Sequence, residues 1–156
     1  MNDAKFRLYG RKGSGSLAVQ MVLEETGAAY ELHWVESTPQ ALAALRRVNP
    51  AGKVPALVLP DGTAVSESAA LLIYLSTAFP AARLAPAPGT SAHARYLQWM
   101  VYLSANVYES ALRYFYADRY SSAGAQGAPA IKARALEEYT GHLEILAGTL
   151  SPYVLG

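Results

Sequence analysis

The chain has 156 residues, of which 52% are hydrophobic and 16% charged, with a formal net charge of +1. This composition predicts a folded globular protein and excludes disorder as its main state. It also excludes a basic face for nucleic acid or an anionic membrane, and no apolar run approaches the ~20 residues that span a bilayer.

The first half of the chain alternates strand and helix signals. Residues 5–9 are typical of a short strand. After a loop rich in glycine and serine, Ser16 begins a helix that runs to Glu25 and is ended by Gly27. Residues 30–34 alternate apolar and polar side chains, as a half-buried strand does. A strand, a crossover helix and a second strand make the two strands parallel neighbours.

A helix, a β-hairpin and another helix follow, at residues 39–48, 56–65 and 68–78. Thr38 is an N-cap and Pro39 occupies the first helical position, while Pro60-Asp61-Gly62 is a turn between two apolar runs. The order βαβ, α, ββ, α is that of a thioredoxin-like α/β domain, which we assign to residues 1–79.

The rest of the chain is predicted to be a linker over residues 80–90 and an all-α domain over residues 91–156. Apolar side chains at helical spacing predict one long helix with a buried stripe at Leu97, Met100, Val101, Ser104, Val107, Tyr108, Ala111, Leu112 and Phe115. A second stripe on another face of this helix contains Arg95, Trp99, Tyr102, Asn106, Glu109, Arg113 and Tyr116. A further helix has its inward side at Leu136, Tyr139, Leu143, Leu146 and Leu150.

The chain contains no cysteine, which excludes disulfides and any mechanism that uses a protein thiol. Thiol chemistry must therefore use a thiol that the ligand brings. His33, His93 and His142 lack the spacing of metal ligands, so we expect no metal site and interpret each as a solvated surface histidine. The residues from Met1 to Phe6 include no apolar signal segment, and we expect a cytoplasmic protein.

With these elements in order, the chain resembles the glutathione S-transferase superfamily in its cytosolic, bacterial, serine-type form. The segments that carry the resemblance are RLYGRKGSGSLAVQ, NPAGKVPAL and VSESAALLIYL, followed by the linker and the long helix. The resemblance implies a homodimeric detoxification enzyme that joins the glutathione thiolate to small hydrophobic electrophiles. Glutathione is then the co-substrate, and no nucleic acid or membrane partner is expected.

The resemblance also implies which residues bind glutathione. The Val54–Pro55 bond is cis in the family, and Val54 pairs with the cysteinyl backbone of glutathione as an added strand does. Glu67 suits the γ-glutamyl ammonium, Ser68 suits the neighbouring carboxylate, and Lys53 can reach the glycyl carboxylate. The alternatives are a trans proline on an edge strand, a plain helix cap at residues 66–68, and a solvated lysine.

A free thiol with a pKa of about 8.5 is only slightly ionised at neutral pH, so the site needs a hydrogen-bond donor that stabilises the thiolate. Three hydroxyl groups are candidates for this donor. Counting forward from Tyr9 matches Ser14 to the catalytic serine of serine-type members. Counting back from the end of the following helix, at Gly27, matches Gly15 to the position that bacterial cysteine-type members use. Ser16 is the next residue. Ser16 is also the natural N-cap of its helix, and Tyr9, the third candidate, also fits a core residue. We favour Ser14, then Ser16.

The second stripe of the long helix is predicted to line the site of a hydrophobic co-substrate through Trp99, Tyr102 and Asn106, or else to pack at a dimer interface. Residues 151–156 resemble the family segment that precedes a capping Ser/Thr-x-x-Asp and a buried helix, so we expect a C-terminally shortened chain. The alternatives for function are a non-catalytic glutathione-binding or regulatory module, and a glutathione-dependent isomerase or peroxidase on the same site.

Overall fold

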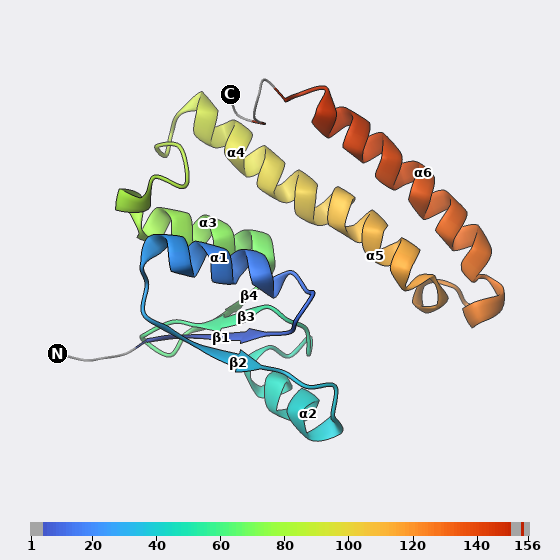
Figure 1. Ribbon diagram of the computed structural model, residues 1–156, viewed down its shortest axis with the longest axis horizontal. Helices are drawn as coiled ribbons and strands as arrows, with labels where there is room; N and C mark the ends of the chain where they lie inside the picture. Colours follow the sequence, from blue (N-terminus) through green and yellow to red (C-terminus); the bar gives the residue numbers. More distant parts are fainter. Residues whose placement is uncertain (1–4, 151–153, 155–156) are drawn as a thin grey trace. The chain divides into compact units, whose positions relative to one another are not determined.

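The computed structural model describes residues 5–150 and 154, and the chain divides into two compact units between Ala85 and Pro86. This boundary lies inside residues 80–90, the predicted linker. The predictions for the N-terminal segment and for residues 151–156 fall mainly outside the described residues. Each unit is described separately below (Figure 1).

The first unit is an α/β unit with one four-stranded sheet in the order β2-β1-β3-β4. β1 is parallel to β2 and antiparallel to β3, and β3 is antiparallel to β4. This confirms the predicted thioredoxin-like succession. Its elements are β1 (Phe6–Gly10), α1 (Ser16–Thr26), β2 (Tyr30–Trp34), α2 (Pro39–Val48), β3 (Ala56–Val58), β4 (Ala64–Ser66), α3 (Ser68–Ala78) and a 3₁₀ turn, η1 (Pro80–Ala82).

Local signals account for where these elements begin and end. The Thr38 hydroxyl accepts the N–H of Ala41 at 3.2 Å and so caps α2. Gly27 ends α1 with φ 68°, a left-handed conformation that glycine adopts without a Cβ clash. In the hairpin turn, the Asp61 carboxylate accepts the N–H of Thr63 at 2.8 Å, and this bond lowers the pKa of Asp61.

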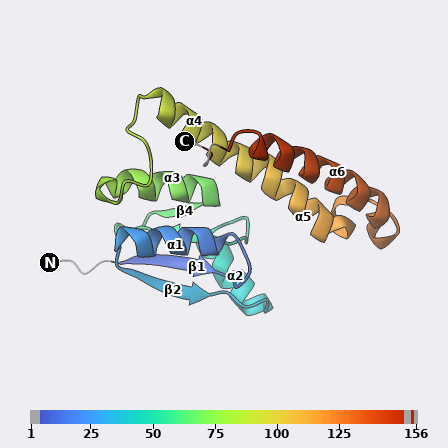
Figure 2. The same ribbon diagram turned by 45° about the horizontal axis from the view of Figure 1, so that its top comes forward.

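The sheet has a helix layer on each face. In Figure 2, α1 and α3 lie together on one side of the strands. The core beneath them consists of buried apolar side chains from both strands and helices: Phe6, Leu8, Val19, Leu23, Leu57, Leu71 and Leu75. On the opposite face, Leu45 of α2 packs with Val35 and Ala56 in a smaller cluster. Because β-strand side chains alternate, Tyr9 belongs to this second face.

The second unit is helical. α4 (Ser91–Tyr102), a π-helical segment (Leu103–Tyr108) and α5 (Glu109–Phe115) follow one another as a single long helix. Two 3₁₀ turns, η3 (Ala117–Tyr120) and η4 (Gly124–Gln126), lead into α6 (Ala128–Ala147), which packs along the long helix. The predicted long helix is therefore present, but its middle widens into a π-helical turn, a feature that often occurs at functional sites.

The predicted inward faces of these helices are only partly covered: Leu97, Met100, Val107 and Leu112 are half-buried, and other members of the stripes are exposed. On the long helix, Val101 and Phe115 are 59% and 73% exposed, whereas Tyr96 and Ser110 are buried. On α6, Leu136 is 51% exposed and its neighbour Ala135 is buried. Each helix has one long neighbour within the unit, and small side chains such as Ser110 and Ala135 allow close packing there. Apolar side chains on the remaining faces stay exposed.

Candidate functional site

The register of the sheet brings three separate segments to one end of the first unit. Tyr9 of β1 pairs with Ala56 of β3, and Ala56 pairs with Ser66 of β4. Because these pairs are antiparallel, the C-terminal ends of β1 and β4 lie at the same end of the sheet as the N-terminal end of β3. Three segments are therefore neighbours there: the loop after β1, the segment before β3 and the residues after β4. The predicted residues Ser14, Val54, Pro55, Glu67 and Ser68 belong to these three segments.

The Val54–Pro55 peptide bond is cis, as the resemblance implied. Pro55 is buried, and Val54 packs partly against the cluster under α2. The preceding loop is shaped by Asn49, whose amide donates to the Lys53 carbonyl at 2.7 Å and whose side-chain oxygen accepts the N–H of Ala51 at 3.1 Å. Lys53 itself is exposed.

Asn49, the C-cap residue of α2, was not among the predicted site residues, but its side chain bonds the loop that leads to Val54. Its side chain is 6% exposed and both ends of its amide are bonded to the loop that carries Val54. A buried amide that bonds at both ends holds the backbone around it in one conformation. The Asn-Pro dipeptide after α2 is a turn signal that could have identified it.

Glu67 joins β4 to α3 in a backbone conformation that side chains other than glycine rarely adopt, with φ 70° and ψ 111°. Such a conformation costs of order 1–3 kcal/mol and is found most often at functional sites. The Glu67 side chain is exposed and makes no capping hydrogen bond to α3, which argues against a plain helix cap. Ser68 is the first residue of α3, where backbone N–H groups have no partner within the helix.

Ser14 lies in the loop before α1 and Ser16 is the first residue of α1, and of the two Ser14 is the more exposed. Ser14 is half-buried, whereas Ser16 is 2% exposed. Their hydroxyl oxygens are 2.8 Å apart, and each also lies within hydrogen-bond distance of the Arg11 carbonyl. The predicted N-cap role of Ser16 is wrong: Gly15 is the N-cap residue and Ser16 is the first helical residue.

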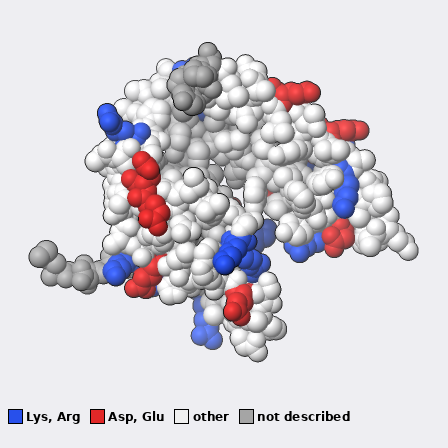
Figure 3. Space-filling model, in the orientation of Figure 1, with Lys and Arg blue, Asp and Glu red and all other residues white. Residues whose placement is uncertain are grey.

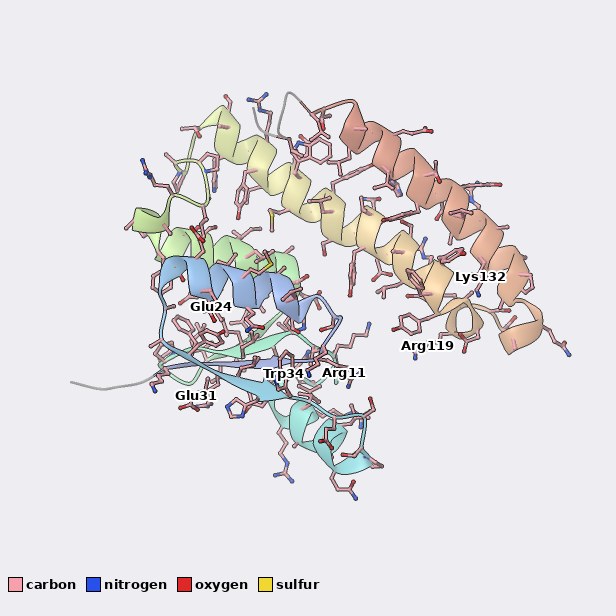
Figure 4. The ribbon with its side chains drawn as sticks, viewed as in Figure 1. Arg11, Glu24, Glu31, Trp34, Arg119 and Lys132 are labelled. Atoms are coloured by element: carbon pink, nitrogen blue, oxygen red, sulfur yellow. The ribbon has the colours of Figure 1, made fainter. Side chains whose placement is uncertain are left out.

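Tyr9 lies on the face of the sheet opposite to α1. Its ring stacks on that of His33, with centroids 5.0 Å apart and planes at 17°, and it packs against the cluster under α2. The alternative interpretation of Tyr9 as a packed sheet residue therefore fits its surroundings best. Nearby, the Arg11 side chain donates from Nε to the Val35 carbonyl at 3.3 Å, and Arg11 lies beside Trp34 in Figure 4.

Comparisons with known proteins identify the family to which this fold belongs. A family model of the glutathione S-transferase N-terminal domain matches residues 15–78. A glutathione transferase homolog from Sulfitobacter, solved with bound glutathione, has a TM-score of 0.86 at 27% identity over 98% of this chain and 74% of that chain. A sphingomonad glutathione S-transferase complexed with glutathione has a TM-score of 0.73 at 31% identity, over 93% of this chain and 70% of that chain.

The chain belongs to the glutathione S-transferase superfamily. Among curated proteins it is 29% identical over 106 residues to the glutathione S-transferase GstA of Escherichia coli O157:H7, covering 66% of this chain and 53% of that protein. It is 35% identical over 104 residues to a "Probable maleylacetoacetate isomerase" of Caenorhabditis elegans, covering 65% of this chain and 48% of that protein. The chain spans about half the length of the curated relatives it matches.

In the helical unit of this superfamily member, two of the three predicted co-substrate residues, Tyr102 and Asn106, lie beside residues of α6. Tyr102 lies edge-on to Trp99, and its hydroxyl is 2.8 Å from Nδ1 of His142 on α6. His142 is therefore bonded within the unit, and its interpretation as a solvated surface residue is wrong. Asn106 lines a cavity of about 290 Å³ with Ala105, Arg113, Glu138 and His142. The co-substrate role of Trp99, Tyr102 and Asn106 stays a prediction.

Surface charge, potential metal ligands and the length of the helices bear on other kinds of site in the part of the chain that the structure describes. Basic and acidic side chains are interspersed on the face seen in Figure 3. Within the described residues, His, Asp and Glu side chains form no cluster that could hold a metal ion. No helix among these residues has the length and apolar character needed to cross a membrane.

Proposed function

We propose that this chain carries the glutathione site of a glutathione transferase, and that Ser14 is the residue that stabilises the reactive thiolate. The observation that carries the proposal is the sheet register, which brings the Ser14 loop, the cis Val54–Pro55 segment and the Glu67–Ser68 junction to one end of the sheet. Relatives solved with bound glutathione support the same ligand.

In this proposal glutathione lies across the three segments as an extended peptide. Its cysteinyl backbone pairs with the backbone of Val54, as an added strand would. Its γ-glutamyl ammonium meets the Glu67 carboxylate, and the adjacent carboxylate meets the hydroxyl and N–H of Ser68 at the start of α3. Its glycyl carboxylate meets the ammonium group of Lys53, which is exposed. The strained backbone of Glu67 is then the cost of aiming its carboxylate at the ligand.

The reaction begins when the glutathione thiol loses its proton to solvent water. Ser14 donates its hydroxyl hydrogen to the resulting thiolate, and the start of α1 adds a favourable partial positive charge. The sulfur then attacks an electrophilic carbon, so that a carbon–sulfur bond forms and a leaving group such as halide departs with its electron pair. We propose a small hydrophobic electrophile, bound with the help of Trp99, Tyr102 and Asn106, and a homodimeric enzyme.

The test measures glutathione affinity by calorimetry and turnover with an activated aromatic halide. Ser14→Ala is expected to lower turnover by roughly ten- to a thousand-fold, the effect of removing one anion donor, while glutathione affinity stays nearly constant. Ser122→Ala, at an exposed serine of the helical unit, is the matched control. Binding without turnover in the unmodified protein would favour the non-catalytic module, and absence of binding would contradict the site itself.

A second reaction on the same site is favoured by the 35% identity to a protein named as a maleylacetoacetate isomerase. A thiolate can add to a conjugated double bond, allow rotation about the resulting single bond, and leave again as thiolate, so that glutathione is unchanged. A cis-enedione substrate distinguishes the two reactions. Isomerisation without consumption of glutathione would support this reaction, whereas a stable adduct would support conjugation.

A further inference from the structure

The hydroxyl of Ser16, a buried residue, belongs to a hydrogen-bonded triangle that joins the first residue of α1 to the loop before it. The Ser14 hydroxyl oxygen is 2.7 Å from the Arg11 carbonyl and 2.8 Å from the Ser16 hydroxyl oxygen. The Ser16 oxygen is 3.1 Å from the same Arg11 carbonyl and accepts the Arg11 N–H at 3.1 Å. The N–H of Ser16 points back to the Ser14 oxygen at 3.3 Å.

The position of Ser16 depends on a neighbouring glycine in β1. A Cβ added at Gly10 would lie 2.8 Å from the Ser16 hydroxyl oxygen and 3.0 Å from its Cβ, closer than non-bonded atoms approach. Ser16 therefore occupies the space that a larger residue at position 10 would take. Ser16 is 2% exposed whereas Ser14 is half-buried, so Ser14 is the better candidate for direct contact with a thiolate.

The triangle contains two hydroxyl hydrogens and one carbonyl that both can reach. Without a ligand, the shorter distance favours donation from Ser14 to the Arg11 carbonyl, while Ser16 donates to the Ser14 oxygen. If Ser14 turns its hydrogen toward a thiolate, the carbonyl loses that bond. Ser16 can then donate to the Arg11 carbonyl, or it can keep its bond to the Ser14 oxygen and polarise the Ser14 hydroxyl as a stronger donor.

We propose that Ser16 is a positioning residue that releases the Ser14 hydroxyl to the glutathione thiolate by supplying the replacement donor inside the loop. This inference rests on the proposed function of Ser14. It gives the two neighbouring serines different roles: Ser14 contacts the sulfur, and Ser16 acts only through Ser14. The N–H of Ser14 also donates to the Arg11 carbonyl, at 3.3 Å, and this bond does not need either hydroxyl. Loss of Ser16 removes the one other hydroxyl that bonds this carbonyl, which favours keeping the Ser14 hydroxyl hydrogen on the Arg11 carbonyl.

The direct measurement is the pKa of the thiol of bound glutathione, followed by the ultraviolet absorbance of the thiolate across a pH series at saturating glutathione. Ser16→Ala is expected to raise this pKa by about one unit, from the size of one hydrogen bond, which lowers the thiolate fraction near neutral pH by up to about tenfold. The affinity for S-methylglutathione, which has no ionisable thiol, is expected to stay unchanged.

Three further variants separate positioning from packing. Ser16→Thr retains a hydroxyl and is expected to restore the low thiol pKa. Gly10→Ala retains both serines but displaces the Ser16 hydroxyl, and it is expected to raise the thiol pKa as Ser16→Ala does. In the double variant of Ser14→Ala with Ser16→Ala, the pKa is expected to match that of Ser14→Ala alone, because Ser16 acts through Ser14.

The outcomes are distinguishable. An unchanged thiol pKa in a folded Ser16→Ala protein would overturn the inference, and so would a shift of the same size in the Ser14→Ala background. If Ser16→Ala does not fold, Gly10→Ala decides in the same way. If the unmodified protein binds S-methylglutathione but does not lower the thiol pKa of glutathione, the role of Ser14 fails and the role of Ser16 fails with it.

Discussion

The two units of this chain differ in how much of their apolar surface they bury. In the α/β unit, seven side chains form a cluster with exposed fractions of 0–7% between the sheet and two helices. In the helical unit, the buried apolar residues within the described part of the chain are Tyr96, Ala117 and Ala135. Phe115, Val101 and Ile145 of that unit are all more than half exposed.

This difference follows from the number of neighbours that each element has. A strand in the sheet has a neighbour beside it and a helix layer on its face, so its inward side chains are enclosed. A helix that packs along a single partner encloses only one narrow side. Burial of apolar area is the main favourable contribution to folding, so the α/β unit should unfold at the higher denaturant concentration. The proposed glutathione site is thus built on the better-packed unit.

The largest expected effect is on the core of the α/β unit. Leu57→Ala removes a fully buried side chain and is expected to lower the free energy of unfolding of this unit by about 2–5 kcal/mol. The measurement is urea unfolding followed by the fluorescence of Trp34, in a Trp99→Phe background, since each unit contains one tryptophan. Leu136→Ala, at a half-exposed leucine of α6, is the control.

Unfolding of the Leu136→Ala control is followed by the fluorescence of Trp99 in a Trp34→Phe background. This substitution is expected to change the free energy of unfolding of the helical unit by less than about 1 kcal/mol. Equal losses for the two leucine substitutions would contradict the contrast between the units. A Leu57→Ala protein whose Trp99 transition also moved would show that the two units unfold together.

An intermediate effect is expected at Glu67, where stability and binding should change in opposite directions. Glu67→Gly removes the side chain from a positive-φ position and is expected to stabilise the α/β unit by about 1 kcal/mol. The same change removes the carboxylate proposed for the γ-glutamyl ammonium. Glutathione affinity is therefore expected to fall by about tenfold or more, measured by calorimetry.

Arg83 provides the matched control, because it also has positive φ, at 52°, but lies outside the proposed site. Arg83→Gly is expected to stabilise the protein by about 0.5–1 kcal/mol with glutathione affinity unchanged. A loss of stability in Glu67→Gly, or an unchanged affinity, would show that its backbone conformation does not serve the ligand.

The smallest expected effect is in the helical unit, at the hydrogen bond between Tyr102 and His142. Tyr102→Phe keeps the ring against Trp99 and removes the hydroxyl, which should lower the stability of this unit by about 0.5–1.5 kcal/mol. The loss of stability is measured by urea unfolding followed by the fluorescence of Trp99. Tyr108→Phe, at an exposed tyrosine of the π-helical segment, should leave the transition unchanged. Equal shifts for both substitutions would show that the bond to His142 adds nothing.

Much of the α/β unit could be predicted because its signals are local. A cap at Thr38, a left-handed glycine at Gly27 and the turn around Asp61 act through the backbone within a few residues. The cis bond before Pro55 was implied by a motif of neighbouring residues. The faces of the helical unit were predicted only in part, because periodicity identifies apolar stripes but does not say which stripe has a partner.

The sequence by itself determined the order of elements, the family and the three segments that make up the proposed glutathione site. It left Ser14 and Ser16 unresolved, since two ways of counting matched different residues. Only the tertiary structure shows that their surroundings differ: the missing side chain at Gly10 leaves space for the Ser16 side chain, which is buried, while Ser14 is half-buried. The physical reason is that the exposure of each serine depends on contacts between β1 and α1. Neither the spacing of residues along the chain nor their types can predict those contacts.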